Sequence, residues 1–325
     1  MRINANNLLR SAMLALLLII VPTLGFSGGY QPTHERSAHE RELIVFGDSL
    51  SDSGNFFINT GEFSVQPFEF IPSAPYARSG FHFTNGRTWI ERVARQLNDR
   101  RSGKPAFRRP GRFTNYAYGT ARSRASGTAF DLGNQVGLFL SDFNGQAPQQ
   151  PTYVMWTGAN DVRDAVNALF IDPSGATSSG ILNEAVTATA DNIIALYGSG
   201  ARTFMVANVP NIGLTPAVRA FGPEAEAAAL QMSILYNQGL GQALDSLEVF
   251  PEIRIVRLDV FEILAELVDD LQSEGRVNVT ESCINPGVIV DAICDRPGKY
   301  LFWDGIHPTR VGHRHLAREA LALLQ

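Results

Sequence analysis

Short apolar runs alternate with amphipathic segments along this chain, and the alternation constrains its fold more than any other feature. The strand candidates are Leu43–Phe46, Asn115–Tyr118, Thr152–Trp156, Thr203–Ala207 and Ile253–Leu258. The predicted helices are Trp89–Leu97, Val162–Leu169, Ile181–Tyr197, Pro223–Leu247, Val260–Leu271 and Thr309–Leu324. Strands that alternate with helices form a parallel sheet with both faces covered. The pattern therefore predicts an α/β fold, a three-layer α/β/α sandwich around a mostly parallel five-stranded sheet.

The expected strand order predicts where polar residues meet. In a flavodoxin-like order the first and third strands are neighbours, and ligands bind beside the carboxyl ends of the strands at that point. The first strand runs into Gly47-Asp48-Ser49, and the third is followed by Thr157-Gly158-Ala159-Asn160. We therefore expect Ser49 and Asn160 to face one crevice.

The composition is that of one globular domain, which we place at residues 42–325 because no long linker interrupts the pattern. The hydrophobic content is 45%, charged residues make up 18%, and the formal net charge is −5. No run of lysine and arginine is interleaved with aromatic residues, so nucleic acid is not an expected partner.

The first 27 residues have the pattern of a signal peptide. An arginine-containing start precedes the apolar core Ala12–Val21, and the small residues Gly25 and Ser27 fit a cleavage after Ser27. A membrane anchor is the alternative, but a spanning helix needs roughly 20 apolar residues, and this run is shorter. We expect a secreted protein, periplasmic or extracellular, with residues 28–41 as a flexible segment.

The two cysteines, Cys283 and Cys294, lie close together in the sequence. An even pair in an exported protein is most simply a disulfide, and two free thiols are the alternative. A metal site is not expected, because no histidine lies near either cysteine in the sequence.

Ser49, Asp304 and His307 have the residue types of a nucleophile, an orienting acid and a base. A serine hydroxyl is a poor nucleophile until a base removes its proton. His307 lies just before the last predicted helix, and Asp304 can accept a hydrogen bond from its second ring nitrogen. Ser49 is preferred to Ser51 and Ser53 because it directly follows the strand and its glycine. The alternative is that Asp304 stabilises a turn and His307 is an exposed loop residue.

Acyl transfer also needs hydrogen-bond donors for the carbonyl oxygen that becomes negative. The candidates are the backbone amide of Ser49, the side-chain amide of Asn160 and the backbone amide of Gly119. Glycine suits this role because it has no side chain to obstruct the approach.

The segment from Phe56 to Phe83 is rich in phenylalanine and proline. Phe56 and Phe57 follow the Ser49 loop, and we expect them to line an acyl pocket, since binding sites are concave and largely apolar. The alternative is that these rings pack a long loop onto the core.

These motifs resemble those of the GDSL/SGNH hydrolase family, and most closely its secreted lipase, phospholipase and haemolysin-like branch. The similar segments, in the family's order, are Phe46-Gly47-Asp48-Ser49-Leu50-Ser51-Asp52-Ser53-Gly54-Asn55, Asn115–Gly119, Gly158-Ala159-Asn160-Asp161 and Asp304-Gly305-Ile306-His307-Pro308-Thr309. The resemblance implies the SGNH hydrolase fold, no metal or organic cofactor, and the roles already given: Ser49 as nucleophile, His307 as base, Asp304 as its orienting acid, and Ser49, Gly119 and Asn160 as oxyanion donors. Gly119 is the least regular match, because Thr120 stands where a second glycine is more usual.

The activity expected from these residues is hydrolysis of carboxylic esters by a serine esterase or lipase. The expected partners are lipid or short-to-medium acyl esters and, transiently, lipid surfaces. Three alternatives stay open: deacetylation of a carbohydrate, transfer of an acyl group from a phospholipid to an acceptor, and lipid binding without catalysis. The sequence does not determine the oligomeric state.

Overall fold

The computed structural model describes residues 42–64, 76, 80–127, 130–285, 288 and 291–325. The described residues belong to one compact unit. The predicted signal peptide over residues 1–27 and the predicted flexible segment over residues 28–41 lie outside the described residues. Within the described part, no helix is both long and apolar enough to cross a membrane.

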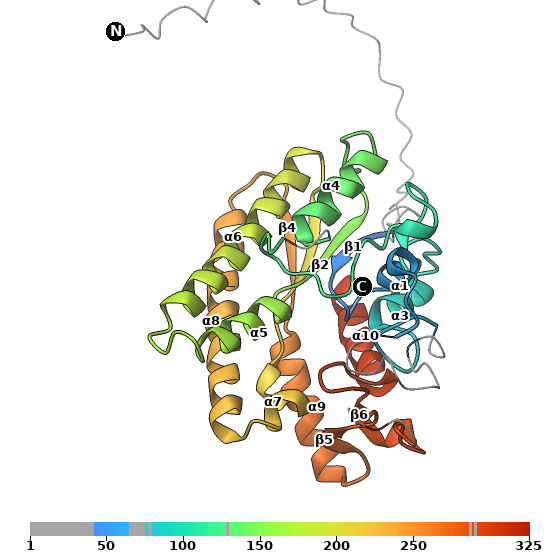
Figure 1. Cartoon of the computed structure of the whole chain (residues 1–325). Coiled ribbons are helices and arrows are strands. Elements are labelled where there is room, and N and C mark those ends of the chain that lie inside the picture. The colour runs from blue at the N-terminus through green and yellow to red at the C-terminus, as the bar shows by residue number, and fades with distance from the viewer. Residues whose placement is uncertain (1–41, 65–75, 77–79, 128–129, 286–287, 289–290) are drawn as a thin grey trace, which may run out of the picture. The chain divides into compact units, whose positions relative to one another are not determined.

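A parallel sheet lies at the centre of this unit (Figure 1). Its strands, adjacent in the order of the sequence, are β1 (Leu43–Gly47), β2 (Thr152–Trp156), β3 (Thr203–Ala207) and β4 (Arg254–Leu258). Every residue of β1 and β2 is buried. A strand buried on both faces must be apolar throughout, which is why Leu-Ile-Val-Phe-Gly forms the first strand.

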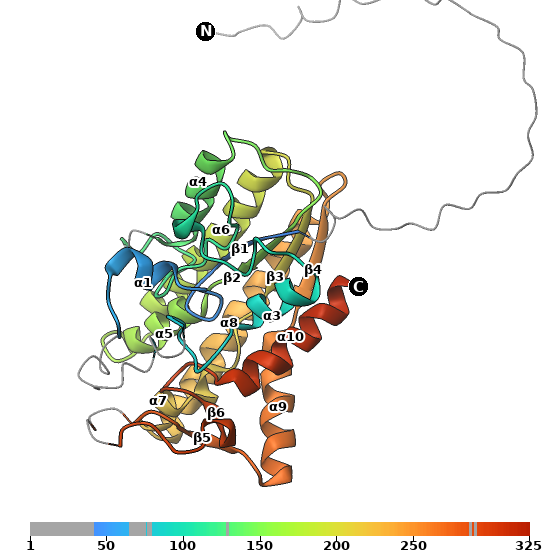
Figure 2. The same ribbon diagram turned by 90° about the vertical axis from the view of Figure 1, so that its right-hand side faces the viewer.

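Helices cover both faces of the sheet (Figures 1 and 2). The helices in the described part of the chain include α1 (Asn55–Thr60), α3 (Trp89–Gln96), α4 (Leu132–Asp142), α5 (Ala159–Ala168), α6 (Ala176–Gly198), α7 (Pro216–Arg219), α8 (Pro223–Leu247), α9 (Val260–Glu274) and α10 (Arg310–Leu324). Successive side chains of a strand point to opposite faces. Ile44 and Phe46 therefore join the core beneath α4, α5, α6 and α8, whereas Leu43 and Val45 join the core beneath α3, α9 and α10.

The predicted α/β fold with a covered parallel sheet is confirmed, but one of the five predicted strands, Asn115–Tyr118, is not a strand. Asn115–Tyr118 is an extended segment beside β1: it forms one isolated bridge with Val45, and Tyr118 N–H donates to the Gly47 carbonyl at 3.0 Å. The side chain of Asn55 donates to the carbonyls of residues 115 and 117, both at 2.8 Å. On the edge of this segment that faces away from β1, these bonds from a side chain take the place of backbone hydrogen bonds to a further strand.

A second, small sheet not predicted from the sequence pairs β5 (Asn278–Ser282) with β6 (Tyr300–Phe302) in parallel. The predicted disulfide is present, and it joins Cys283, directly after β5, to Cys294. The Cys283 amide donates to the Phe302 carbonyl at 3.0 Å. The disulfide therefore lies beside the strand that leads to residues 304–307.

A buried histidine links α3 to α10 and gives the fold a predictable acid sensitivity. His313 is 1% exposed, and its Nδ1 accepts a hydrogen bond from the Trp89 amide at 3.2 Å. Burial, with smaller contributions from Arg92, His307 and His82, lowers the pKa of His313 to about 3. An unfolded imidazole has a pKa of about 6.5. The unfolded chain therefore binds the extra proton between these values, and stability that is present above pH 6.5 is lost as the pH falls toward 3.

We expect His313→Gln to remove this contribution to the acid sensitivity. Between pH 6 and pH 4 the free energy of unfolding of the native sequence should fall more steeply than that of the variant, by up to ~1.4 kcal/mol per pH unit. Urea denaturation at several pH values measures both slopes. Equal slopes would show that His313 titrates normally in the folded protein.

Candidate active site

The loop after β1 places Ser49 at the carboxyl edge of the sheet. The Gly47 amide donates to Oε1 of Gln135 at 2.9 Å and the Gln135 amide returns a bond to the Gly47 carbonyl at 2.8 Å, so the strand end is fixed from α4. A Cβ on Gly47 would lie 3.0 Å from a carbonyl oxygen of β2. The buried Asp48 then accepts a hydrogen bond from the Leu50 amide at 2.9 Å, which closes the turn around Ser49.

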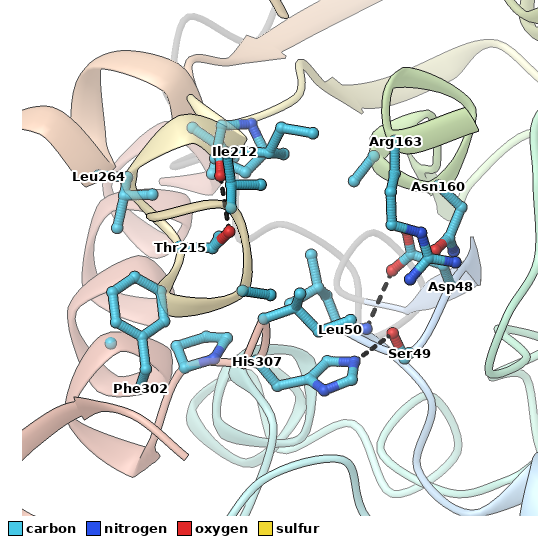
Figure 3. Close-up of a pocket in the computed structure, with 18 of the residues that line it drawn as sticks. Asp48, Ser49, Leu50, Asn160, Arg163, Ile212, Thr215, Leu264, Phe302 and His307 are labelled. Atoms are coloured by element: carbon cyan, nitrogen blue, oxygen red, sulfur yellow. Dashed lines mark hydrogen bonds between the residues drawn. The ribbon is translucent and has the colours of Figure 1, made fainter. Parts of the chain in front are cut away.

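The structure brings Ser49, His307 and Asp304 together, although 255 positions separate Ser49 from Asp304 in the sequence. His307 Nε2 is 2.7 Å from Ser49 Oγ (Figure 3), and His307 Nδ1 is 2.7 Å from Asp304 Oδ2. His307 and Asp304 lie in the loop between β6 and α10. The hydroxyl, the imidazole and the carboxylate therefore form one hydrogen-bonded chain.

Asp304 is 2% exposed, and both of its carboxylate oxygens are hydrogen-bonded. Its Oδ1 accepts from the amides of Ile306 and His307 at 2.9 and 2.8 Å, and its Oδ2 also accepts from the Tyr76 hydroxyl at 2.6 Å. Burial alone would raise the pKa of Asp304, but the His307 imidazole and these hydrogen bonds hold the pKa below its usual value. Asp304 is therefore a fixed negative charge facing Nδ1 of His307.

An aromatic cluster packs behind His307. The Phe83 ring lies 5.2 Å from the His307 ring, and Phe56 and Phe57 lie 5.4 and 5.1 Å from Phe83 between ring centroids. The structure thus packs Phe56 and Phe57, which we expected to line the acyl pocket, against Phe83, the ring that contacts the imidazole. Neither ring lines the cavity beside Ser49.

The other two expected oxyanion donors differ in their availability. Asn160, in the first turn of α5, lines the same cavity as Ser49; one of its Nδ2 hydrogens is donated to the Ala121 carbonyl at 2.9 Å. The Gly119 amide donates to Asp52 Oδ2 at 2.8 Å. A Cβ on Gly119 would lie 2.5 Å from the Phe83 ring, so close packing explains the glycine at this position.

Two residues of the Ser49 loop that the sequence reasoning did not single out hold the neighbouring segments in place. Oxygens of Asp52 accept from the amides of Gly54, Asn55, Phe56 and Gly119 at 2.6–3.0 Å. The side chain of Asn55 bonds the segment at residues 115–117. Burial raises the pKa of Asp52 to about 6. The only sequence signal for these roles is an acid and an amide spaced three apart in a serine- and glycine-rich loop.

A cavity of about 220 Å³ opens beside Ser49 and His307 (Figure 3). Most of its lining is apolar and comes from α5, α7, α9, α10 and the 3₁₀ turn before α7; it includes Val166, Ile212, Val260, Leu264, Leu267 and Phe302. The side chains of Asn160 and Arg163 are on one side of the cavity, and Leu264 and Phe302 are on the other (Figure 3). Over the described ranges, no group of three His, Cys, Asp or Glu side chains has the arrangement of a metal site.

Comparisons with known proteins found a matching family model and several similar proteins. A family model for the GDSL-like lipase/acylhydrolases matches residues 43–320. A GDSL esterase/lipase of Arabidopsis thaliana is 27% identical over 312 residues, which cover 86% of this chain and 88% of the relative. A thermolabile hemolysin of Vibrio parahaemolyticus is 25% identical, and the match covers 86% of this chain and 63% of the hemolysin. A solved acetylxylan esterase mutant from Geobacillus stearothermophilus has 14% identity and a TM-score of 0.46, over 87% of this chain and 93% of that one.

A parallel sheet flanked by helices, with Ser49 and His307 at its carboxyl edge, is the open α/β architecture in which ligands bind at that edge. The chain belongs to the GDSL-like lipase/acylhydrolase family, since the family model matches most of its length. It is a carboxylic ester hydrolase. The family resemblance predicted from the four sequence segments is confirmed.

Proposed function

We propose that the chain cleaves acyl esters through an acyl-enzyme formed on Ser49. The observation that carries this proposal is the hydrogen-bonded chain from Ser49 Oγ to His307 to Asp304, with 2.7 Å at each step. His307 Nε2 takes the hydroxyl proton as Oγ attacks the ester carbonyl, and it then gives the proton to the departing alcohol. Water activated by the same nitrogen releases the acid. Asp304 keeps the Nδ1 proton in place, so Nε2 is free to accept.

The negative oxygen of the tetrahedral intermediate needs donors beside Ser49. The Ser49 amide and the Nδ2 group of Asn160 fit this role, because both belong to residues that line the cavity next to His307. Gly119 supplies a third donor in this proposal when its amide bond to Asp52 is exchanged for one to the oxyanion.

The substrate proposed is an ester with an apolar acyl chain, and two features support it. The lining of the cavity is mostly aliphatic and aromatic. Large apolar side chains also lie exposed at or beside its rim: Phe170 is 73% exposed, Phe221 77%, and Ile171, next to Phe170, 90%. Exposed apolar groups beside an apolar site suit a lipid or lipid-surface substrate. Each methylene that enters the cavity contributes about 0.8 kcal/mol.

Narrowing the apolar end of the cavity should shorten the preferred acyl chain. We expect Leu264→Trp to lower kcat/KM for p-nitrophenyl decanoate about 10-fold more than for the butyrate ester, which corresponds to roughly two methylenes excluded. Phe56→Ala is the control, because Phe56 lies outside the cavity, and it should change both esters by one factor. If Phe56→Ala changed the chain-length selectivity and Leu264→Trp did not, the acyl pocket would lie in the aromatic cluster instead.

A fluorophosphonate probe followed by peptide mapping tests the nucleophile directly. We expect covalent labelling of Ser49 in the native sequence and none in Ser49→Ala, together with hydrolysis of p-nitrophenyl esters. An acetylated glycan and a sterol acceptor, added in parallel, separate this activity from carbohydrate deacetylation and from acyl transfer. Labelling of another serine, or no labelling with a folded protein, would reject the proposed mechanism.

We also propose that the protein is secreted. The support is the signal-like composition of residues 1–27 and the disulfide between Cys283 and Cys294, a bond typical of oxidising compartments. The mature protein, expressed from its full sequence in a bacterial host and recovered from outside the cytoplasm, should begin at Gly28. An intact amino terminus on the recovered protein would instead indicate an uncleaved anchor.

A further inference from the structure

The cavity beside Ser49 contains one arginine, Arg163. Asn160 and Arg163 are three positions apart on α5, so their side chains lie on the same face of the helix. Both line the cavity, and Figure 3 shows the guanidinium of Arg163 next to Asn160 and Asp48, above Ser49. Arg163 is partly buried.

This guanidinium forms no hydrogen bond and no ion pair with any part of the chain that the structure describes. The neighbouring carboxylate, Asp164, is occupied by Arg122 and Arg124 at 2.9 and 2.7 Å. Asp48 contributes only a longer-range attraction, and burial raises the pKa of Asp48 itself to about 6. Arg163 is therefore a cation without a close counter-charge.

An unpaired guanidinium is costly in such a place. It carries five N–H donors in a planar fork, and burial without partners penalises both the donors and the charge. Desolvation accordingly lowers the pKa of Arg163, with the positive charge of Arg122 adding to the effect. Carboxylates and phosphates relieve this cost, because they accept two parallel hydrogen bonds from the fork.

We propose that Arg163 binds an anionic group, phosphate or carboxylate, on the alcohol side of the ester substrate. This inference rests on the proposed function, since it assumes that the ester carbonyl lies at Ser49. Figure 3 gives the direction: Leu264 and Phe302 form the apolar side that suits the acyl chain, whereas Arg163 is on the opposite side of the cavity, above Ser49. The preferred substrate is then an amphiphile with an apolar acyl chain and an anionic alcohol.

Arg163 has a competing explanation as a counter-charge for Asp48 alone. In that case removal of Arg163 would disturb the Ser49 loop and lower kcat/KM for every substrate by the same factor. A substrate-binding role instead changes the ratio of rates between charged and neutral substrates. The test therefore measures this ratio.

Three octanoyl esters that differ only in the alcohol provide the comparison: 1-octanoylglycerol, 1-octanoylglycerol 3-phosphate and 3-octanoylglycerate. We expect the native enzyme to prefer at least one anionic ester by 10-fold or more in kcat/KM at low salt, measured as released octanoate below the micelle concentration. Arg163→Gln should lower that preference about 10-fold, and Arg163→Lys should retain part of it. Arg219→Gln, an equal charge change outside the cavity lining, should leave the preference within twofold.

The two anionic esters identify the group that is bound: preference for the phosphate alone assigns a phosphate, and preference for both assigns any anion. Titration of the Ser49→Ala protein with 1-octanoylglycerol 3-phosphate adds a readout without turnover, in which Arg163→Gln should raise Kd about 10-fold. No preference in the native enzyme, or an equal loss on all three esters in Arg163→Gln, overturns the anion site while hydrolysis stands. Failure to hydrolyse any of the three, with no labelling of Ser49, overturns the proposed function as well.

Discussion

Ser49→Ala is expected to lower kcat by about 10⁶-fold, because the covalent route is lost and only the donors and the substrate contacts remain. The backbone of the Ser49 loop should not change, since the loop is held by Gln135 and by the side chains of Asp48 and Asp52. KM or Kd should therefore change little. Steady-state kinetics on a p-nitrophenyl ester, with the variant purified apart from any native enzyme, measures the loss.

Ser53→Ala is the matched control for this loss. It is the same substitution four positions along the same loop, and Ser53 Oγ is buried without a hydrogen-bond partner in the described structure. Removing that hydroxyl should leave kcat within about twofold and should not destabilise the protein. A Ser49→Ala enzyme that keeps more than about a thousandth of the native kcat would show that another nucleophile or a bound water acts in its place.

The central strands could be predicted from the sequence because each is a short, mostly apolar run, whereas the missed elements lack such a pattern. The α4 helix contains two glycines, Gly133 and Gly137, which weaken its helical signal. β5 is mostly polar and β6 has three residues. Asn115–Tyr118 reads as a strand, but its edge is bonded by the distant side chain of Asn55. In the case of Asn115–Tyr118, a contact between segments far apart in the sequence determines the structure.

Some residues of the candidate site could likewise be located from the sequence, and others could not. Ser49, Asn160, Asp304 and His307 could be located because each lies in a short motif at the end of a predicted strand or helix. Tyr76 could not, since it reaches Asp304 across 228 positions and no local pattern marks it.

The acyl cavity proposed here does not contain Phe56 or Phe57, and there is a physical reason why the sequence favoured them. Apolar residues that line a cavity have the same periodicity as apolar residues in the core, so proximity in sequence to Ser49 favoured Phe56 and Phe57. The fold packs both rings against Phe83 and builds the cavity mainly from α5, α7, α9 and α10.

Asp304→Asn is expected to lower kcat by about 10⁴-fold without moving the backbone. The two amides that bond Oδ1, those of Ile306 and His307, would still find a carbonyl oxygen in the variant. The new amide group would then face His307 Nδ1 and donate a hydrogen to it. The ring proton would then be on Nε2 and point at Ser49. In that tautomer Nε2 has no free lone pair and cannot accept the hydroxyl proton. The hydrogen bond from Tyr76 to Oδ2 would also be lost, which adds a cost in stability of about 1 kcal/mol.

Kinetics and probe labelling together distinguish the wrong tautomer from a distorted site. In the Asp304→Asn enzyme, kcat and the rate of fluorophosphonate labelling should fall by similar factors, because both need the proton of Ser49 removed, while KM should change little. Asp295→Asn, an exposed aspartate nearby in the sequence, is the control and should retain native kinetics. A loss below 10-fold would mean that Asp304 serves the fold of its loop rather than the base. A large rise in KM with unaltered labelling would assign it to substrate binding, because orientation of the imidazole affects only steps in which His307 moves a proton.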